Sequence, residues 1–353
     1  MKLKKAALLF AAVSLAAAAV AGCSGGQAEA DAPAAEAAAE TTAAETKETA
    51  PETEEASAEE TAAEAEANEE EENYDTGDAA LDNTRNQDEI GEKELMVVSF
   101  GTSYNDNRRL TIGAIEDAME QAFPEYSVRR GFTSQIIIDH VKSRDKVSID
   151  NVGEALERAV ENGVKTLVVQ PTHLMNGLEY TDLVNELAEY ADAFEQIEIG
   201  DPLLTSDEDF TAVVKAITEA TAEYDDGETA ICFMGHGTEA ASNQIYENMQ
   251  QVLTDAGYTN YYIGTVEAEP SLEDVLEAVQ AGEYKRVVLE PLMIVAGDHA
   301  NNDMAGDEEG SWKTVFEDAG YEVTCVVRGL GELEPIQQLF VEHAQTAMDR
   351  LAQ

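Results

Sequence analysis

The chain has 353 residues, a formal net charge of −52 at pH 7 and only 21 lysine and arginine residues. Phosphate backbones would be repelled by so acidic a surface, so the composition excludes nucleic acid as a partner. The same charge would attract cations. The residues that follow position 90 are enough for one large domain or two small ones.

Residues 1–23 have the composition of an export signal. Lysines at positions 2, 4 and 5 precede an apolar run over residues 6–21, and the run ends in Val20-Ala21-Gly22-Cys23. This ending resembles a bacterial lipobox, so we expect a lipoprotein signal peptide with lipidation at Cys23. An ordinary signal peptide and a single membrane helix are the alternatives, although the apolar run is short for a span of ~20 residues. The lipid would anchor the protein outside the cytoplasm without spanning the membrane.

Residues 24–93 are rich in Ala, Glu and Thr and contain few large apolar side chains. Such a segment cannot bury enough apolar surface to offset the entropy of ordering it. We therefore predict a disordered acidic tether up to residue 93.

From residue 94 onward, apolar runs alternate with segments of helical period. In residues 94–226 we expect strands at 95–100, 126–130, 165–171 and 197–202, and helices at 111–123, 134–141, 149–161, 180–193 and 207–224. In residues 227–353 we expect strands at 229–234, 261–266, 286–291 and 323–327, and helices at 239–256, 270–281, 311–319 and 333–352. This order predicts two tandem Rossmann-like α/β domains with parallel sheets and a site in the cleft between them.

The two halves also share a loop pattern. Pro171 to Gly177 has the same spacing as Pro291 to Gly297, and each glycine is followed two residues later by a potential ligand, Glu179 or His299. Because parallel sheets place ligand sites at the carboxyl ends of their strands, we expect both residues to face one cleft.

Three of the five histidines lie at predicted strand ends. His236 stands between two glycines and His299 follows an aspartate, which together with Glu179 makes an imidazole–carboxylate set suited to a divalent transition metal. The same histidines can accept protons and are the predicted catalytic residues. The alternatives are a tight-turn histidine at 236 and a surface histidine at 299. His173 is either a buried structural residue or a substrate contact.

Other motifs argue against competing chemistries. Neither half opens with a glycine-rich phosphate loop, so we expect no nucleotide. Cys232 and Cys325 lie within predicted strands that would not be neighbours in a 2-1-3-4 order, and we interpret both as core residues. Four arginines follow predicted strands and are candidates to pair with acidic groups of a substrate, the alternative being solvated surface charges. These are Arg108, Arg109, Arg129 and Arg130.

Several of these motifs resemble the anaerobic sirohydrochlorin cobaltochelatase family of class II chelatases. They are VVSFGTSY at 97–104, FTS at 132–134, NGLEY at 176–180, FMGHG at 233–237 and PLMIVAGDHANNDMA at 291–305. The resemblance implies a chelatase-type fold and ATP-independent insertion of Co²⁺ into a tetrapyrrole. It places the metal on His236, His299 and Glu179. It also favours Ser99, Gly101, Thr102, Ser103 and His173 as substrate contacts.

The export signal leaves a second function open. Relatives acting in cobalamin synthesis are usually cytosolic, so an exported form could instead bind haem, iron or another metal without turnover. Co²⁺ is the first expectation for the metal, with Fe²⁺ and Ni²⁺ as alternatives. A homo-oligomer is compatible with the sequence.

Overall fold

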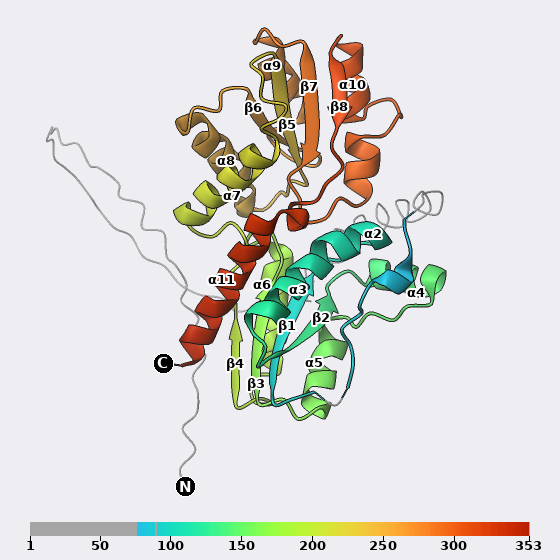
Figure 1. Cartoon of the computed structure of the whole chain (residues 1–353), viewed down its shortest axis with the longest axis vertical. Helices are drawn as coiled ribbons and strands as arrows, with labels where there is room; N and C mark the ends of the chain where they lie inside the picture. The colour runs from blue at the N-terminus through green and yellow to red at the C-terminus, as the bar shows by residue number, and fades with distance from the viewer. Residues whose placement is uncertain (1–75, 89, 353) are drawn as a thin grey trace, which may run out of the picture. The chain divides into compact units, whose positions relative to one another are not determined.

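The computed structural model describes residues 76–88 and 90–352, and within them the chain forms two four-stranded parallel sheets (Figure 1). The strand orders are β2-β1-β3-β4 and β6-β5-β7-β8, so the two sheets have the same topology. This confirms the predicted α/β class, and the second sheet has the 2-1-3-4 order on which the interpretation of Cys232 and Cys325 depended.

The first sheet and its helices occupy the chain up to residue 220. The strands are β1 (Lys93–Ser99), β2 (Ser127–Phe132), β3 (Thr166–Pro171) and β4 (Gln196–Ile199). The helical segments are η1 (Ala79–Leu81), α2 (Asn105–Arg108), η2 (Arg109–Gly113), α3 (Ala114–Ala122), α4 (Gln135–Asp145), α5 (Val152–Glu161), α6 (Leu178–Glu189) and α7 (Asp207–Ala220).

The second sheet repeats this arrangement. Its strands are β5 (Thr229–Gly235), β6 (Tyr261–Thr265), β7 (Arg286–Pro291) and β8 (Glu322–Cys325). The helical segments are η3 (Ala241–Asn243), α8 (Gln244–Asp255), α9 (Leu272–Gln280), η4 (Ala300–Met304), α10 (Trp312–Asp318), η5 (Leu330–Glu332) and α11 (Glu334–Leu351).

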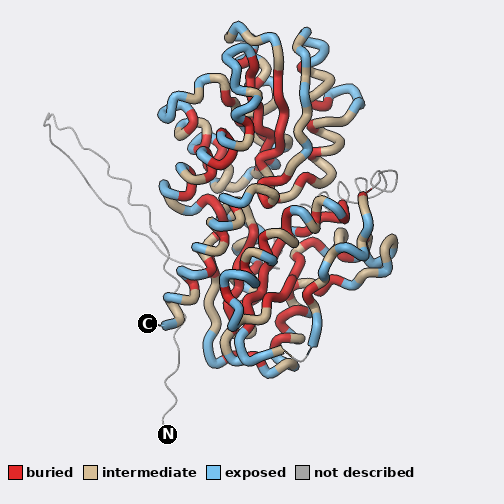
Figure 2. Tube along the Cα trace, in the orientation of Figure 1, coloured by how far each residue is buried: buried red, intermediate tan, exposed pale blue. Residues whose placement is uncertain are grey.

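The central strands are apolar on both faces because helices cover both sides of each sheet. Figure 2 shows the strands as largely buried, and residues 95–98 of β1 and 230–234 of β5 have no exposed surface. Leu95 pairs with Val128 on one side and Val168 on the other, which fixes the register of the first sheet. Continuous burial of this kind is what a doubly covered parallel strand requires.

Two helices pack away from the sheet nearest to them in the sequence. Helix α11 follows the second sheet but packs against α3, β3 and β4 of the first sheet (Figure 1). Helix α7 precedes the second sheet and packs against α8 of that sheet. The division of the chain at residue 226 remains a prediction. Helix α7 precedes this residue and packs with the second sheet's helix α8, whereas α11 follows it and packs on the first sheet.

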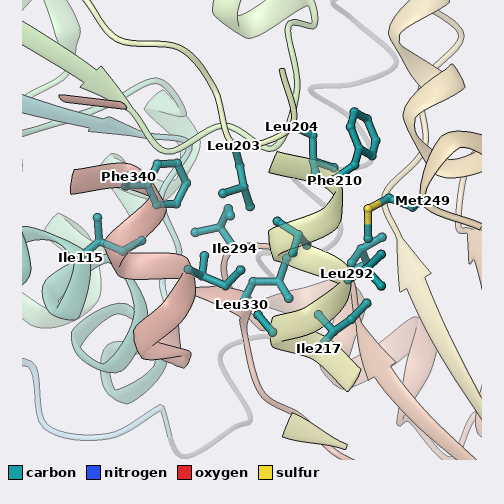
Figure 3. Close-up of a cluster of buried hydrophobic side chains, with 14 of the residues drawn as sticks. Ile115, Leu203, Leu204, Phe210, Ile217, Met249, Leu292, Ile294, Leu330 and Phe340 are labelled. Atoms are coloured by element: carbon teal, nitrogen blue, oxygen red, sulfur yellow. The ribbon is translucent and has the colours of Figure 1, made fainter. Parts of the chain in front are cut away.

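The crossing helices build one apolar core that reaches both sheets. Figure 3 shows Phe210 and Ile217 of α7, Phe340 of α11 and Met249 of α8 within this cluster. Helix α11, at the C-terminal end of the chain, is therefore part of the core beneath the first sheet.

The segment 76–88 is packed, which corrects the prediction of a disordered tether up to residue 93. Asp82 and Arg85 of this segment are buried in ion pairs with residues of the first sheet and its helices. The remainder of the predicted tether, residues 24–75, and the predicted signal peptide lie outside the described residues. No helix in the described part of the chain has the length and apolarity needed to cross a bilayer.

Candidate metal centre

His236 is presented by a turn that only glycines allow. It follows directly on β5, and a Cβ at Gly235 would lie 2.2 Å from the ring of Tyr246. Gly237 has φ +92°, a conformation that side chains disfavour, and its N–H donates to the Tyr246 hydroxyl at 3.2 Å. The Nδ1 of His236 lies 3.0 Å from the Gly237 carbonyl oxygen. A carbonyl can only accept, so this bond places the proton on Nδ1 and leaves Nε2 free as a ligand.

Glu267 is held beside His236 through the backbone. It lies two residues beyond β6, and its N–H donates to the His236 carbonyl at 2.9 Å. The carboxylate oxygen Oε2 then lies 3.6 Å from Nδ1 of His236. Neighbouring strands β5 and β6 therefore deliver an imidazole and a carboxylate to the same point.

His299 lies in the segment that follows the third strand of the sheet, β7, directly before η4. Its Nδ1 lies 2.6 Å from Oδ2 of Asp303. Burial tends to lower the pKa of His299. The hydrogen bond to Asp303 and the negative charges of Asp303, Glu267 and Asp298 outweigh this effect, so the pKa is raised. A carboxylate on one ring nitrogen fixes the tautomer and leaves the other nitrogen to a metal.

The three side chains converge. The rings of His236 and His299 are 4.7 Å apart between centroids and nearly perpendicular, at 84°. One ligand atom each from His236, Glu267 and His299 lies within 4.8 Å of the other two. The side chains of His236 and Glu267 are 49% and 52% exposed, so one side of the set is open. Two imidazoles and one carboxylate with open positions suit a divalent transition metal that must also meet a substrate.

Glu179 occupies the position in the first half that His299 occupies in the second. Each lies at the start of the helical segment after the third strand of its sheet, two residues beyond a glycine: Glu179 is the second residue of α6 and His299 directly precedes η4. Glu179 is exposed and lines a cavity of about 330 Å³ together with Phe100 and Leu183. It is not one of the three residues that converge, and its role as a metal ligand remains a prediction.

Glu267 was missed by the sequence reasoning. It belongs to none of the motifs that indicated the site, and acidic residues are too frequent in this chain for one of them to stand out. Its place directly after a predicted strand, like that of His236, was the signal that could have identified it.

Four of the five predicted substrate contacts are buried in the structure. Ser99, Thr102 and Ser103 are buried, and the Ser99 hydroxyl accepts from Thr172 at 2.7 Å. Gly101 has φ +108°, and a Cβ there would meet the Phe132 ring at 2.6 Å. These residues shape the loop after β1, and their contact with a substrate remains a prediction.

His173 lies in the loop between β3 and α6 and is half-buried. Both of its ring nitrogens are enclosed without a hydrogen-bond partner among the residues the structure describes. Burial lowers the pKa of His173, while the charge of Glu179 opposes this shift. His173 and Glu179 are therefore near one another, and the proposed substrate contact of His173 remains a prediction.

The proposal that four arginines face the substrate is wrong for three of them. Arg108 and Arg130 have no exposed side-chain surface and pair with Asp82 at 2.7 Å each. Arg129 is also buried, near Glu94. Arginines that follow strands can be enclosed when carboxylates accompany them, and here Asp82 comes from the segment before the first strand.

The remaining cysteines and histidines agree with structural roles. Cys232 is fully buried on β5 and Cys325 partly buried on β8, two strands that are not neighbours. His343 on α11 lies 2.9 Å from Asp209 Oδ1 of α7, so it ties the two crossing helices together.

The fold and the site together define a two-sheet α/β protein with a candidate divalent-metal centre, and comparisons with known proteins lead to its family. The chain matches the family described as cobalt chelatase (CbiK) over residues 93–349. It is 34% identical over 257 residues to the sirohydrochlorin cobaltochelatase of Salmonella typhimurium, covering 73% of this chain and 97% of that protein. It is 30% identical over 261 residues to the sirohydrochlorin cobaltochelatase CbiKC of Nitratidesulfovibrio vulgaris, covering 73% and 92%.

The chain belongs to the CbiK cobalt chelatase family. A solved structure, SirB from Bacillus subtilis with Fe³⁺, is similar in fold, with a TM-score of 0.51 and 12% identity over 74% of this chain and 98% of that one. The predicted family membership and the predicted chelatase-type fold are thereby confirmed.

Proposed function

We propose that this protein inserts Co²⁺ into a sirohydrochlorin-type tetrapyrrole without a nucleotide. The observation that carries the proposal is the convergence of His236, Glu267 and His299 at the carboxyl ends of three neighbouring strands. The names of the two curated relatives support the same reaction. Fe²⁺ and Ni²⁺ suit the same ligand set, and the assay below compares them.

The metal is a substrate in this reaction, so its ligands must hold it and then release it. His236 and His299 would supply neutral nitrogens and Glu267 a single negative charge. These three ligands carry one negative charge in total and leave one side of the ion open, so they can capture a divalent ion and do not enclose it completely. Asp303 would keep the His299 ring oriented throughout.

Insertion releases two N–H protons from the macrocycle for each metal ion that enters it. As the ion leaves the protein, the ligand nitrogens regain their lone pairs and can accept protons. His236 and His299 therefore serve as ligands first and as proton acceptors afterwards. The raised pKa of His299 favours its protonated form once the metal has left.

We also propose that the enzyme is exported and anchored to the membrane through lipid on Cys23. The support is the lysine-rich start, the apolar run and the Val20-Ala21-Gly22-Cys23 ending. The tetrapyrrole would then be one that is available outside the cytoplasm. Haem binding without turnover is the competing function at that location.

The test is an absorbance assay of the purified protein with sirohydrochlorin and Co²⁺, Fe²⁺ or Ni²⁺, beside a titration with haem. We expect metal-dependent conversion of the sirohydrochlorin spectrum, fastest with Co²⁺, and no need for ATP. Tight haem binding with no conversion by any metal would establish the binding-protein function instead.

A further inference from the structure

The segment 76–88, here called the strap, precedes residue 93, where the match to the family begins. It is attached to the first half by backbone bonds as well as by side chains. The Asp106 N–H donates to the Thr76 carbonyl at 2.8 Å, and Arg85 is almost fully buried. The strap thus lies outside the residues that match the family and is packed onto the first half.

Asp82 of the strap completes a buried ionic cluster. It lies 2.7 Å from Arg108 and 2.7 Å from Arg130, and all three side chains are at most 2% exposed. Glu116 binds Arg130 through both of its oxygens, each at 2.7 Å. Among the described residues, Asp82 is the carboxylate in an ion pair with Arg108. Burial tends to raise the pKa of Asp82, but the two guanidinium groups hold it below its usual value.

Arg108 connects the strap to the loop after β1. It donates to the Thr102 carbonyl oxygen at 2.9 Å and to Asn105 Oδ1 at 2.5 Å. These bonds fix the loop from inside, so the position of that loop depends on the orientation of the Arg108 guanidinium, which Asp82 sets.

The same loop and helix contact the segment that carries His299. Thr102 lies against Gly297, where an added Cβ would be 3.3 Å from the Thr102 hydroxyl oxygen. Asn107, next to Arg108, accepts the N–H of Ala296 at 2.8 Å. Contacts therefore run from the strap through α2 to the turn two residues before His299.

We propose that the strap positions the His299 loop for metal binding, with Asp82 as the positioning residue that acts through Arg108. The proposal rests on the metal site described above. A segment outside the family match would then affect how tightly the enzyme binds its metal. The same segment would connect the predicted tether to the enzyme domain.

The first test compares Asp82→Asn with Asp88→Asn in the full chain. Both change one strap carboxylate, but Asp88 is 66% exposed and pairs with Arg158 at the surface. Asp82→Asn leaves Arg108 buried beside an amide, so we expect Tm to fall by roughly 10 °C. We expect Kd for Co²⁺, measured by calorimetric titration well below the melting range, to rise about tenfold. Asp88→Asn should leave both values unchanged.

The second test uses the unaltered protein and does not require a variant to fold. If the strap strengthens Co²⁺ binding, Co²⁺ must stabilise the docked strap by the same factor. Trypsin can cut after Arg85 only when this buried residue is released, so saturating Co²⁺ should slow that cleavage. Cleavage after Lys146, which is exposed at the end of α4, is the internal reference.

The outcomes distinguish a failure of the strap proposal from a failure of the proposed function. A wild-type protein that does not bind Co²⁺ overturns both proposals. A wild-type protein that binds Co²⁺, with unchanged affinity in Asp82→Asn, overturns the strap proposal alone, even if Tm falls. If Asp82→Asn cannot be purified, the proteolysis test decides alone: cleavage after Arg85 that Co²⁺ does not slow would overturn the strap proposal.

Discussion

At the scale of the residue, the site depends on a few positions where a side chain cannot be enlarged. Gly235 is the clearest, because a methyl group there would overlap the buried ring of Tyr246. The ring cannot move without disturbing the core that surrounds it, and the backbone of His236 is next in the chain. The presentation of His236 is thus coupled to the packing beneath it.

We therefore predict that Gly235→Ala destabilises the protein by about 1–3 kcal/mol, the cost of overpacking, and weakens Co²⁺ binding. Gly91→Ala is the matched control, since nothing lies within 4 Å of a Cβ at that position. Urea unfolding and Co²⁺ titration of both variants provide the measurement. Equal behaviour of the two variants would contradict the steric argument.

Glu94 allows a prediction about pH. Burial raises its pKa to about 8, although Arg129 opposes the shift. A carboxyl group whose folded pKa is raised stabilises the fold below its unfolded pKa, and this contribution is lost as pH rises through the folded value. The free energy of unfolding should therefore fall as pH rises from about 4.5 to 8, because over this range Glu94 loses its proton in the unfolded protein and keeps it in the folded protein. Glu94→Gln should flatten that slope in thermal unfolding; an unchanged slope would mean that Glu94 is ionised in the folded protein.

Sequence reasoning reached His236 and His299 because flanking glycines and a neighbouring aspartate distinguish them. It did not reach Glu267, since a carboxylate after a strand has no distinguishing neighbours in so acidic a chain. It misjudged Arg108 and Arg130 because the burial of an arginine depends on a carboxylate brought from elsewhere. Asp82 lies in a stretch whose composition is typical of disorder.

At the scale of the element, the strands follow directly from the sequence, but the partners of the helices do not. Apolar runs predicted the positions of all eight strands, and the parallel order followed from the alternation with helices. An amphipathic helix shows which face it buries and does not show against which sheet. The exchange of α7 and α11 between the two sheets was for that reason not predictable from periodicity.

The exchange predicts that the two halves unfold together. Phe340 of α11 is fully buried in the core that reaches both sheets (Figure 3). Phe340→Ala should cost about 3–5 kcal/mol and leave a single unfolding transition. Glu342→Ala, on an exposed position of the same helix, should change stability by less than about 0.5 kcal/mol. Two separate transitions in the wild-type protein would contradict a shared core.

At the scale of the whole molecule, a predicted export signal and a predicted acidic tether would precede the family enzyme domain. The net charge of −52 would concentrate divalent cations near the surface. The strap is where the predicted tether would meet the domain. The family match, which begins at residue 93, gives no indication of this connection.

Lipidation of Cys23 gives a prediction for the intact protein in its membrane. Mass spectrometry of the mature chain should show that residues 1–22 have been cleaved off and that Cys23, the new N-terminus, carries lipid. Cys23→Ala should retain the unprocessed N-terminus and lose the lipid mass. A mature wild-type protein that keeps residues 1–22 would refute the lipoprotein interpretation.

The most direct test of the central claim is the rate of Co²⁺ insertion into sirohydrochlorin by four variants measured side by side. His236→Ala, His299→Ala and Glu267→Gln each remove one of the converging ligands, while Glu273→Gln changes an exposed carboxylate on α9. The account predicts that the first three lose at least about 100-fold in rate, remain folded by circular dichroism, and differ from a fully active Glu273→Gln. Full insertion activity in any of the three ligand variants would contradict the assignment of the metal centre.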